Sequence, residues 1–422
     1  HPADLASVFG SLLDTERQAV FSLLVERSGR LAMETVSEMG PEDGAKLLTG
    51  RSAEEIAKLL QEIPSDDAAA LIDYLPEELS TEVLELMRRR ESGQVESLLE
   101  YGEQTAGRIM NPQVFNLSED LTVGEAITAL QGSRDVEMVF YLYVVDARRH
   151  LVGVTSLRRL LLVSPETPLK RIMTPEVTSV RVDTDQEEVA RQVASYNLLA
   201  VPVVDEENKL VGVVTVDDVI DVIKDEASED LLRLAGVSGD ERVATPAAEA
   251  FPKRLPWLLA NLVTAFLAAS VVALFEGTIQ QVTALAIFMP IVAGMGGNAG
   301  TQTLTVIVRG LALGELSWAS GKKVLGKEAL IGLGNGFALG LVAAGVAWAT
   351  KADPILALLL GMAMVCNMFV AATAGVLVPL GLKAMKVDPA LGSSVFITTF
   401  TDVVGFASFL GLATIFLRYL VQ

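Results

Sequence analysis

Asp402 is the one acidic side chain deep inside a long apolar run near the C-terminus, VFITTFTDVVGFASFLGLATIFLRYLV. The nearest flanking charges, Asp388 and Arg418, are 14 and 16 residues away, which is roughly 20 Å along a helix. A carboxylate at the middle of a bilayer costs on the order of 3 kcal/mol or more unless water, a partner or a cation meets it. The pattern therefore favours an ion pathway, and the alternative is a protonated Asp that is hydrogen-bonded to a neighbouring helix.

A second apolar run, residues 289–303 (MPIVAGMGGNAGTQT), is rich in glycine and contains Pro290, so it predicts a weakened or broken helix. In a membrane, irregular backbone is tolerated where it lines a water-filled cavity. Three polar side chains follow the glycines: Asn298, Thr301 and Gln302. Freed carbonyls and these side chains would suit a hydrated cation. The alternative is close helix packing through the GxxxG pair Gly296 and Gly300.

The run 216–237 predicts a helix whose acids repel one another along one side. Successive i, i+4 positions hold Asp217, Asp221, Asp225 and Glu229, and the flanking acids are Asp218, Glu226 and Asp230. Within this stripe only Lys224 offsets the repulsion. A solvated acidic face is one interpretation. The other is a site for divalent cations, and these oxygen ligands suit Mg²⁺ or Ca²⁺.

Charge divides the chain into two parts. Residues 1–250 hold 47 of the 53 acids and 23 of the 33 bases, so their net charge is −24, whereas residues 251–422 carry +4. This contrast predicts an acidic soluble region followed by a membrane domain, and the acidic surface argues against nucleic acid as a partner. Cys366 is the single cysteine, which excludes an intramolecular disulfide, and two histidines make a His-rich zinc site or His-based catalysis improbable.

Four segments are expected. Residues 1–105 predict an acidic helical domain of short stacked helices, among them 52–63, 65–75 and 80–87, each starting with a Ser cap. Residues 106–216 hold a duplication: the segment 143–161 recurs at 202–220, a period of 59. Each copy reads as strand, turn, strand and a helix capped by Ser156 or Thr215. Residues 217–250 form a connecting helix and linker, and 251–422 the membrane domain. Because the chain starts at His1, its true N-terminus is expected to be missing.

Five apolar spans are long enough to cross a bilayer: roughly 255–275, 282–309, 329–349, 355–382 and 391–421. With the acidic region inside, the inner flanks carry eight Lys or Arg residues and the outer flanks two, so the C-terminus is expected outside. Within or beside these spans, Asn261, Asn335 and Asn367 are expected to form interhelical hydrogen bonds. The acids at span ends or in loops need no special role: Glu276, Glu315, Glu328 and Asp353.

The duplicated segment resembles a tandem CBS-domain pair, a regulatory module whose clefts hold adenine nucleotides or ions. Together with the PIVAGMGGNAGTQ run, TTFTDVVGF around Asp402 and DTDQEEVA at 183–190, it makes nearly the whole chain similar to the MgtE family of magnesium channels and transporters. The resemblance implies a multidomain α plus α/β fold: a superhelix-like N domain, a CBS pair, a connecting "plug" helix and five membrane helices per subunit of a homodimer.

The resemblance also implies the ion sites. A pore Mg²⁺ would lie at Asp402, with the pore lined by Gly297, Asn298, Thr301, Gln302 and Thr398. Regulatory Mg²⁺ would bind Asp185, Glu187, Asp218, Asp221, Glu226, Glu229 and Asp230, and the Ala194 carbonyl. Asn197 stands where an acid is expected, and Thr301 where an Asn is expected. N-domain acids such as Asp43 and Asp67 are further candidates, and ATP is a candidate ligand of the CBS pair.

These features predict Mg²⁺-selective transport across the cell (inner) membrane, shut by cytosolic Mg²⁺ that bridges the acidic domains, with no enzymatic activity. Two other classes remain. A membrane-anchored nucleotide or ion sensor would need neither five spans nor a polar glycine-rich one. An intramembrane aspartyl protease needs two carboxylates in one site, and a single chain supplies one deep in a span.

Overall fold

The computed structural model describes residues 1–421 except 134–140, 244, 317, 352 and 392. Residue 392, at the start of the last expected span, therefore lies outside the described residues. The chain divides into two compact units, His1–Lys224 and Asp225–Gln422. Each unit is described by itself, and helix α13 (Val216–Leu234) contributes to both.

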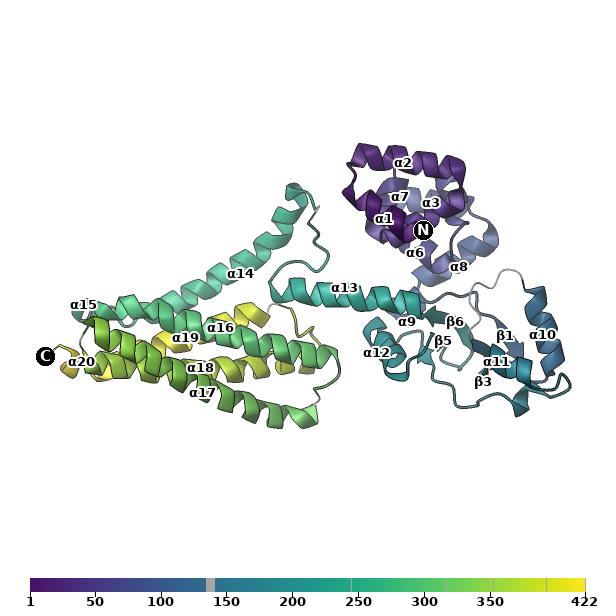
Figure 1. The fold of residues 1–422 in the computed structure, drawn as a ribbon. Coiled ribbons are helices and arrows are strands. Elements are labelled where there is room, and N and C mark those ends of the chain that lie inside the picture. Colours follow the sequence, from purple (N-terminus) through teal and green to yellow (C-terminus); the bar gives the residue numbers. More distant parts are fainter. Residues whose placement is uncertain (134–140, 244, 317, 352, 392, 422) are drawn as a thin grey trace. The chain divides into compact units, whose positions relative to one another are not determined.

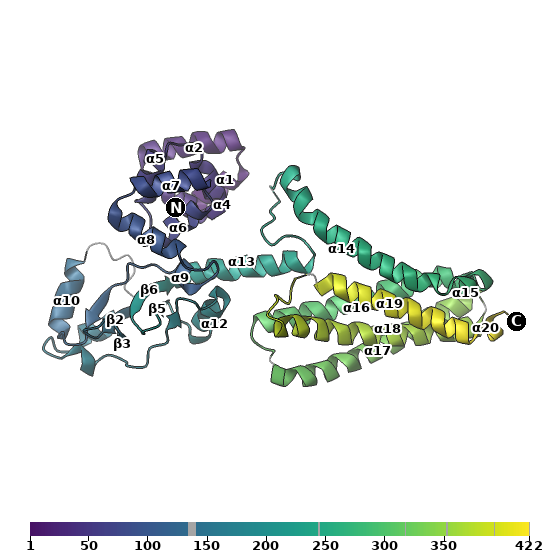
Figure 2. The ribbon, with the colours of Figure 1, turned by 180° about the vertical axis from the view of Figure 1, so that it is seen from behind.

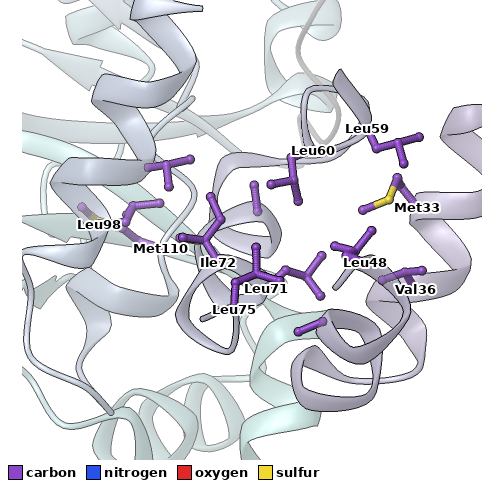
Figure 3. Packing of buried hydrophobic residues seen from close by; sticks show 14 of the residues in the cluster. Met33, Val36, Leu48, Leu59, Leu60, Leu71, Ile72, Leu75, Leu98 and Met110 are labelled. Carbon is purple, nitrogen blue, oxygen red and sulfur yellow. The ribbon is translucent and has the colours of Figure 1, made fainter. Parts of the chain in front are cut away.

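The first unit begins with short helices that stack on one another (Figures 1 and 3). Their bounds are α1 (Pro2–Ser11), α2 (Asp14–Arg27), α3 (Gly29–Glu38), α4 (Pro41–Leu48), α5 (Ala53–Leu60), α6 (Ser65–Asp73), α7 (Glu77–Leu86) and α8 (Arg89–Leu99). Their buried faces share one apolar core, in which Met33, Leu48 and Leu71 are almost fully enclosed. The expected stack of helices is present, since each helix is too short to be stable without this packing.

One of the three expected serine caps is correct. Ser52 accepts a hydrogen bond from the Glu55 amide, 3.3 Å away, and precedes α5. The other two helices begin earlier than expected, because Pro64 and Pro76 occupy their N-cap positions. Ser80 consequently lies inside the first turn of α7, where its hydroxyl donates to the Glu77 carbonyl.

The duplication forms two three-stranded sheets of the same topology. Strands β1 (Asn116–Ser118), β2 (Tyr141–Val145) and β3 (Leu151–Ser156) make one sheet, and β4 (Val180–Arg181), β5 (Ala200–Val204) and β6 (Leu210–Thr215) make the other. In each, the first pair is parallel and the second antiparallel. Tyr141 faces Ser156 and Ala200 faces Thr215, so the registers match at the expected period of 59.

Helices connect and follow these strands. They are α9 (Ala106–Ile109), α10 (Val123–Gly132), α11 (Leu157–Leu162), α12 (Gln186–Tyr196) and a 3₁₀ turn, η1 (Leu169–Arg171). Ser156 caps α11 as expected and accepts from the Arg159 amide. Arg108 of α9 forms an ion pair with Asp73 of α6, which joins the helical stack to the sheets within the first unit.

The described residues of the second unit include five helices that are long and apolar enough to cross a membrane, as expected. They are α14 (Ala247–Ala273), α16 (Ala284–Ala312), α17 (Trp318–Lys351), α18 (Pro354–Ala384) and α19 (Ser393–Ile415). Two short helices, α15 (Glu276–Gln281) and α20 (Leu417–Leu420), follow α14 and α19. The last span was expected to reach residue 421. It is shorter, because the helix ends at Ile415 and a new turn begins at Leu417.

Helices α16 to α19 lie side by side in both views (Figures 1 and 2), and α18 packs against the other three. The α17 and α18 backbones are close. A Cβ added to Gly332, Gly336 or Gly340 would meet backbone atoms of Met368, Val365 or Gly361 at 2.7–2.8 Å. Residues with side chains would force these two helices apart.

Candidate functional site

Asp402 lies in the middle of α19 and is half-buried. Among the described residues, none donates a hydrogen bond to its carboxylate. The structure therefore gives no support to a hydrogen-bonded, neutral Asp402 within one chain. A half-buried carboxylate at this depth is stable only if water or a cation meets it.

Helix α16 faces α19 close to this carboxylate. A Cβ added to Gly297 of α16 would lie 3.6 Å from the Thr398 methyl group of α19, and Thr398 is one helical turn from Asp402, on the same face. Thr301 is one turn from Gly297, and its hydroxyl donates to the Gly297 carbonyl at 3.0 Å. The structure thus brings four expected residues to the facing sides of two helices: Gly297, Thr301, Thr398 and Asp402.

The expected break in the second span is absent, because α16 is one continuous helix from Ala284 to Ala312 with Pro290 inside it. The glycines serve packing instead. A Cβ on Gly296 would come within 2.2 Å of the Asn367 amide nitrogen, and one on Gly300 within 2.3 Å of Ile397. The packing alternative is therefore correct for the GxxxG pair, and the α16 carbonyls are engaged in helical hydrogen bonds.

The three membrane asparagines differ in their roles. Asn367 is fully buried and its amide donates to the Val292 carbonyl at 2.8 Å, which confirms one expected interhelical hydrogen bond. Asn261 is exposed on α14, and Asn335 lines a cavity between α16, α17 and α18. Gln302, expected in the pore lining, lies in this same cavity, and Asn298 is exposed on α16.

The acidic ladder of α13 is partly neutralised. Lys224 lies 3.5 Å from Asp221, as the spacing predicted, and Arg233 forms an ion pair with Glu229. Arg233 also pairs with Asp388, in the segment between α18 and α19. Asp388 was expected to be no more than a flanking charge, and its long-range pairing left no local signal beyond a loop Asp before a Pro.

Asp230 lies in the same cluster and is partly buried. Its loss of hydration, with the nearby charges of Asp388 and Glu226, raises the pKa of Asp230 to about 6. The charged form of Asp230 is thus disfavoured even though Arg233 lies nearby. A divalent cation would add positive charge, so this cluster, which includes Asp388 shortly before α19, is a candidate regulatory site.

A second acidic cleft lies inside the first unit, between α6 and the CBS sheets. It is lined by Asp66 and Asp67 of α6, by Asp217 and Asp218 of α13, and by aromatic side chains from the first CBS copy: Phe115, Tyr141 and Tyr143. Burial and the Asp218 charge raise the pKa of Asp66 well above its usual range, and burial above all raises the pKa of Asp218 to about 7. Oδ1 of Asp66 is enclosed without a hydrogen-bond partner among the described residues.

Sequence reasoning named Asp67 and Asp218 but missed Asp66. Its position at the start of α6, where acids are common, concealed its burial. Asp43, the other N-domain candidate, lies elsewhere, 3.6 Å from Lys46. The Thr215 hydroxyl donates to Asp218 at 2.5 Å, which fixes that carboxylate at the start of α13.

The remaining expected ligands lie on α12. Asp185 caps its N-terminus and accepts from the Glu187 amide at 2.8 Å. Ala194 is near its C-terminus, and Asn197 ends the helix in the left-handed region, with φ of 51°. Opposite ends of α12 cannot share one ion. Within the described parts of the chain, no cluster of three or more His, Cys, Asp or Glu side chains could hold a metal by itself.

Family models cover most of the chain. The MgtE model, described as a divalent cation transporter, matches residues 289–412. The model of the MgtE intracellular N domain matches residues 1–104, and the CBS-domain model matches 106–166 and 169–225. These matches agree with the expected helical N domain, CBS pair and membrane domain.

Curated relatives extend over the whole length. The magnesium transporter MgtE of Thermus thermophilus is 37% identical over 425 residues, covering 99% of this chain and 93% of that protein. The magnesium transporter MgtE of Enterococcus faecalis is 39% identical over 332 residues, covering 78% of this chain and 73% of that protein.

A solved structure resembles the first unit. The crystal structure of the cytosolic domain of the Mg²⁺ channel MgtE in complex with ATP aligns with a TM-score of 0.50 and 39% identity. The alignment covers 53% of this chain and 90% of the chain in the solved structure.

Proposed function

The chain belongs to the MgtE family of divalent cation transporters, and from this premise we propose that it carries Mg²⁺ across the membrane along a pathway at Asp402. The observation that carries the proposal is the half-buried Asp402 carboxylate on α19, one turn from Thr398, which faces Gly297 of α16. This is a polar strip between two membrane helices that ends in a negative charge.

The proposed ion keeps its water. Mg²⁺ dehydrates reluctantly and usually retains several waters in proteins. In a homodimer, two Asp402 carboxylates would face each other and hold the hydrated ion through its water shell, and the Thr398 and Thr301 hydroxyls would complete the polar wall. One carboxylate per subunit gives modest affinity, so the ion can also leave.

The gate is proposed to be the acidic parts of the same chain. Mg²⁺ bound through its water shell between the Asp66 and Asp218 carboxylates would hold α6 against the CBS pair, and binding at Asp230 and Asp388 would hold α13 against the segment that leads into α19. Raised pKa values at Asp66, Asp218 and Asp230 support this, because burial disfavours the charged form of each group and a bound cation would offset that effect. An ion shifts such a gate only by its differential affinity for the closed state.

Further regulatory ligands are proposed at Asp185, Glu187, Ala194, Asp221, Glu226 and Glu229. No group of three or more of these side chains could hold a metal by itself within the described residues, so they would act together with residues of another domain or subunit. The chain is proposed to be a homodimer without enzymatic activity, in the cell membrane, with the acidic domains cytoplasmic and the C-terminus outside.

ATP is a proposed second ligand, since the similar cytosolic domain was solved with ATP. The cleft of Asp66 and Asp218 offers groups that an adenine nucleotide could contact: Phe115 and Tyr141 have aromatic faces for a base, and Thr215 and Asp217 have polar groups for ribose hydroxyls. Bound nucleotide would add negative phosphate charge beside the acids and so change the affinity of the cleft for Mg²⁺.

The test is Mg²⁺ uptake into vesicles that carry the full chain with Asp402→Asn. We expect uptake to fall roughly tenfold or more, because a charge-assisted interaction of about 1.5–3 kcal/mol is lost. Asp353→Asn is the matched control, since Asp353 only caps α18, where Asn works equally well. Unchanged uptake in Asp402→Asn would refute the pathway at Asp402, whereas absence of uptake with the unaltered chain would leave the membrane-anchored sensor as the better description.

A further inference from the structure

A second polar cavity lies between α16, α17 and α18 of the membrane domain, and it opens to the surface of the single chain at Gln302 and Asn335. Its volume is about 260 Å³. Its polar lining residues come from two helices: Gln302 and Thr303 of α16, and Lys327, Glu328 and Asn335 of α17. Of the residues proposed for the ion pathway, only Gln302 contributes to it, so this cavity is separate from the strip at Asp402.

Glu328 is the central group of this cavity. The residue is only 6% exposed, although its sequence position, at the end of a lysine-rich flank, suggested an unimportant acid. One carboxylate oxygen accepts from the Thr303 hydroxyl at a long 3.4 Å. The other lies 3.3 Å from the ammonium group of Lys327, whose side chain is 66% exposed. A buried carboxylate is thus balanced by a flexible, solvent-accessible cation.

The spacing shows that these groups face one another. Residues 328, 331 or 332, and 335 recur at helical intervals on α17, and 299, 302 or 303, and 306 do so on α16. Each stripe has polar groups among apolar ones. Together they direct a carboxylate, a hydroxyl and two amide groups to one space. Such oxygens are the ligands of hard cations, and apolar lipid chains could not satisfy them.

The cavity has a suitable size. A Mg²⁺ ion with its first water shell, with metal–oxygen distances of about 2.1 Å, fills a sphere of about 180 Å³. A volume of about 260 Å³ therefore accommodates the hydrated ion with room for further water, each molecule needing about 30 Å³. Dehydration, the costly step for Mg²⁺, is not required.

The depth of Glu328 permits exchange with water. Helix α17 has 34 residues, about 51 Å, and exceeds the hydrocarbon thickness of about 30 Å. Glu328 is eight residues from Ser320, where the candidate span begins, or about 12 Å along the helix. It therefore lies near one edge of the hydrocarbon layer, and not at its centre.

We propose that this cavity is a second cation site of the membrane domain, which binds a hydrated divalent cation at Glu328. Lys327 acts as a tethered competitor that occupies the carboxylate when no ion is bound. The bound ion joins α16 to α17 through the water shell. The site does not depend on Asp402, and it would exist whether or not Asp402 conducts.

The test is diffraction from crystals of the full-length chain soaked in Mn²⁺, recorded at the manganese absorption edge. We expect an anomalous peak beside the Glu328 carboxylate at an outer-sphere distance. It should disappear in Glu328→Gln, which keeps an acceptor for Thr303. A peak at Asp402 is scored separately, so failure of the proposed pathway and failure of this site can be told apart.

Lys327→Gln gives a second, opposite result. Removing the competing ammonium should raise the Mn²⁺ occupancy at Glu328, whereas Lys323→Gln, a neighbouring exposed lysine, should leave it unchanged. If the Glu328–Lys327 pair were only structural, Lys327→Gln would lower thermal stability and show no manganese. That result, ordered water alone, a lipid headgroup, or a partner side chain in the cavity would each overturn the proposal.

Discussion

At the scale of single residues, the chemistry of this chain depends on carboxylates that lack adequate positive charge. Asp402 has no hydrogen-bond donor among the described residues, and Asp66 has an enclosed oxygen without a partner there. In a solvated acidic face such groups would be hydrated. Their burial favours a bound proton or cation at these groups.

The first prediction concerns pH. The pKa values of Asp66 and Asp218 are raised in the folded state, so the folded state binds protons more tightly than the unfolded one. The stability that these two groups give the folded state is therefore fully present below pH 4, and it is lost as the pH rises through about 7. In chelator, the free energy of unfolding of the first unit should fall by on the order of 3 kcal/mol between pH 5 and pH 8. Thermal unfolding of the full chain measures this change.

Asp66→Asn should flatten this dependence and raise stability at pH 8, because the repulsion with Asp218 is removed. Asp120→Asn, at an exposed position, should retain the wild-type slope. Millimolar Mg²⁺ should flatten the wild-type curve too, since the ion replaces the protons. An unchanged slope in Asp66→Asn would contradict the role given to this carboxylate.

Residue types and local spacing were sufficient to single out Asp402 and the α13 acids as candidates and to predict the strands of the duplicated segment. Pairings over long distances were not visible. Glu328 was assigned to a span end because lysines precede it. Its contact with Thr303, 25 residues earlier in the chain, joins two helices. Asp388 likewise became significant only when Arg233, 155 residues earlier, was found beside it.

At the scale of elements, a glycine-rich run does not interrupt its helix. The glycines of 289–303 suggested a broken helix, but α16 is continuous, and Gly296 and Gly300 admit Asn367 and Ile397 instead. Helix propensity measured in water penalises glycine. Inside a membrane the backbone must satisfy its own hydrogen bonds, so the helix persists.

The second prediction tests close packing between α17 and α18. Gly336→Ala should destabilise the membrane domain by about 1–3 kcal/mol, because the new Cβ would lie 2.8 Å from the Val365 Cα. Gly334→Ala on the same helix meets nothing within 4 Å and should be neutral. Thermal unfolding in detergent measures both, and equal melting temperatures for the two variants would contradict the packing described.

At the scale of the whole molecule, a strongly acidic region and the membrane helices belong to one chain, and one helix contributes to both compact units. Residues 1–250 carry −24, and α13 contributes to both compact units. The charge in the first region opposes compaction unless cations are bound. The proposed feedback needs no separate sensor protein, because the repelling charges and the membrane helices belong to one chain.

The third prediction is protease protection of residues 1–250 in the full chain. With millimolar Mg²⁺ we expect slow digestion, and in chelator cleavage should be faster at the ends of α13, since the acidic clusters then repel. Millimolar K⁺ is the control for general screening of charge. Identical digestion in chelator and in Mg²⁺ would contradict a role for these domains in sensing the ion.

The backbone contact between α17 and α18 has a mechanical consequence. Three glycines, at 332, 336 and 340, bring the backbones of the two helices into contact over more than two turns. If one helix slid along the other, larger side chains would enter this contact region. We therefore expect α17 and α18 to move together as one rigid pair, so that a movement that opens a passage would involve α14, α16 and α19, which carry or adjoin Asp402.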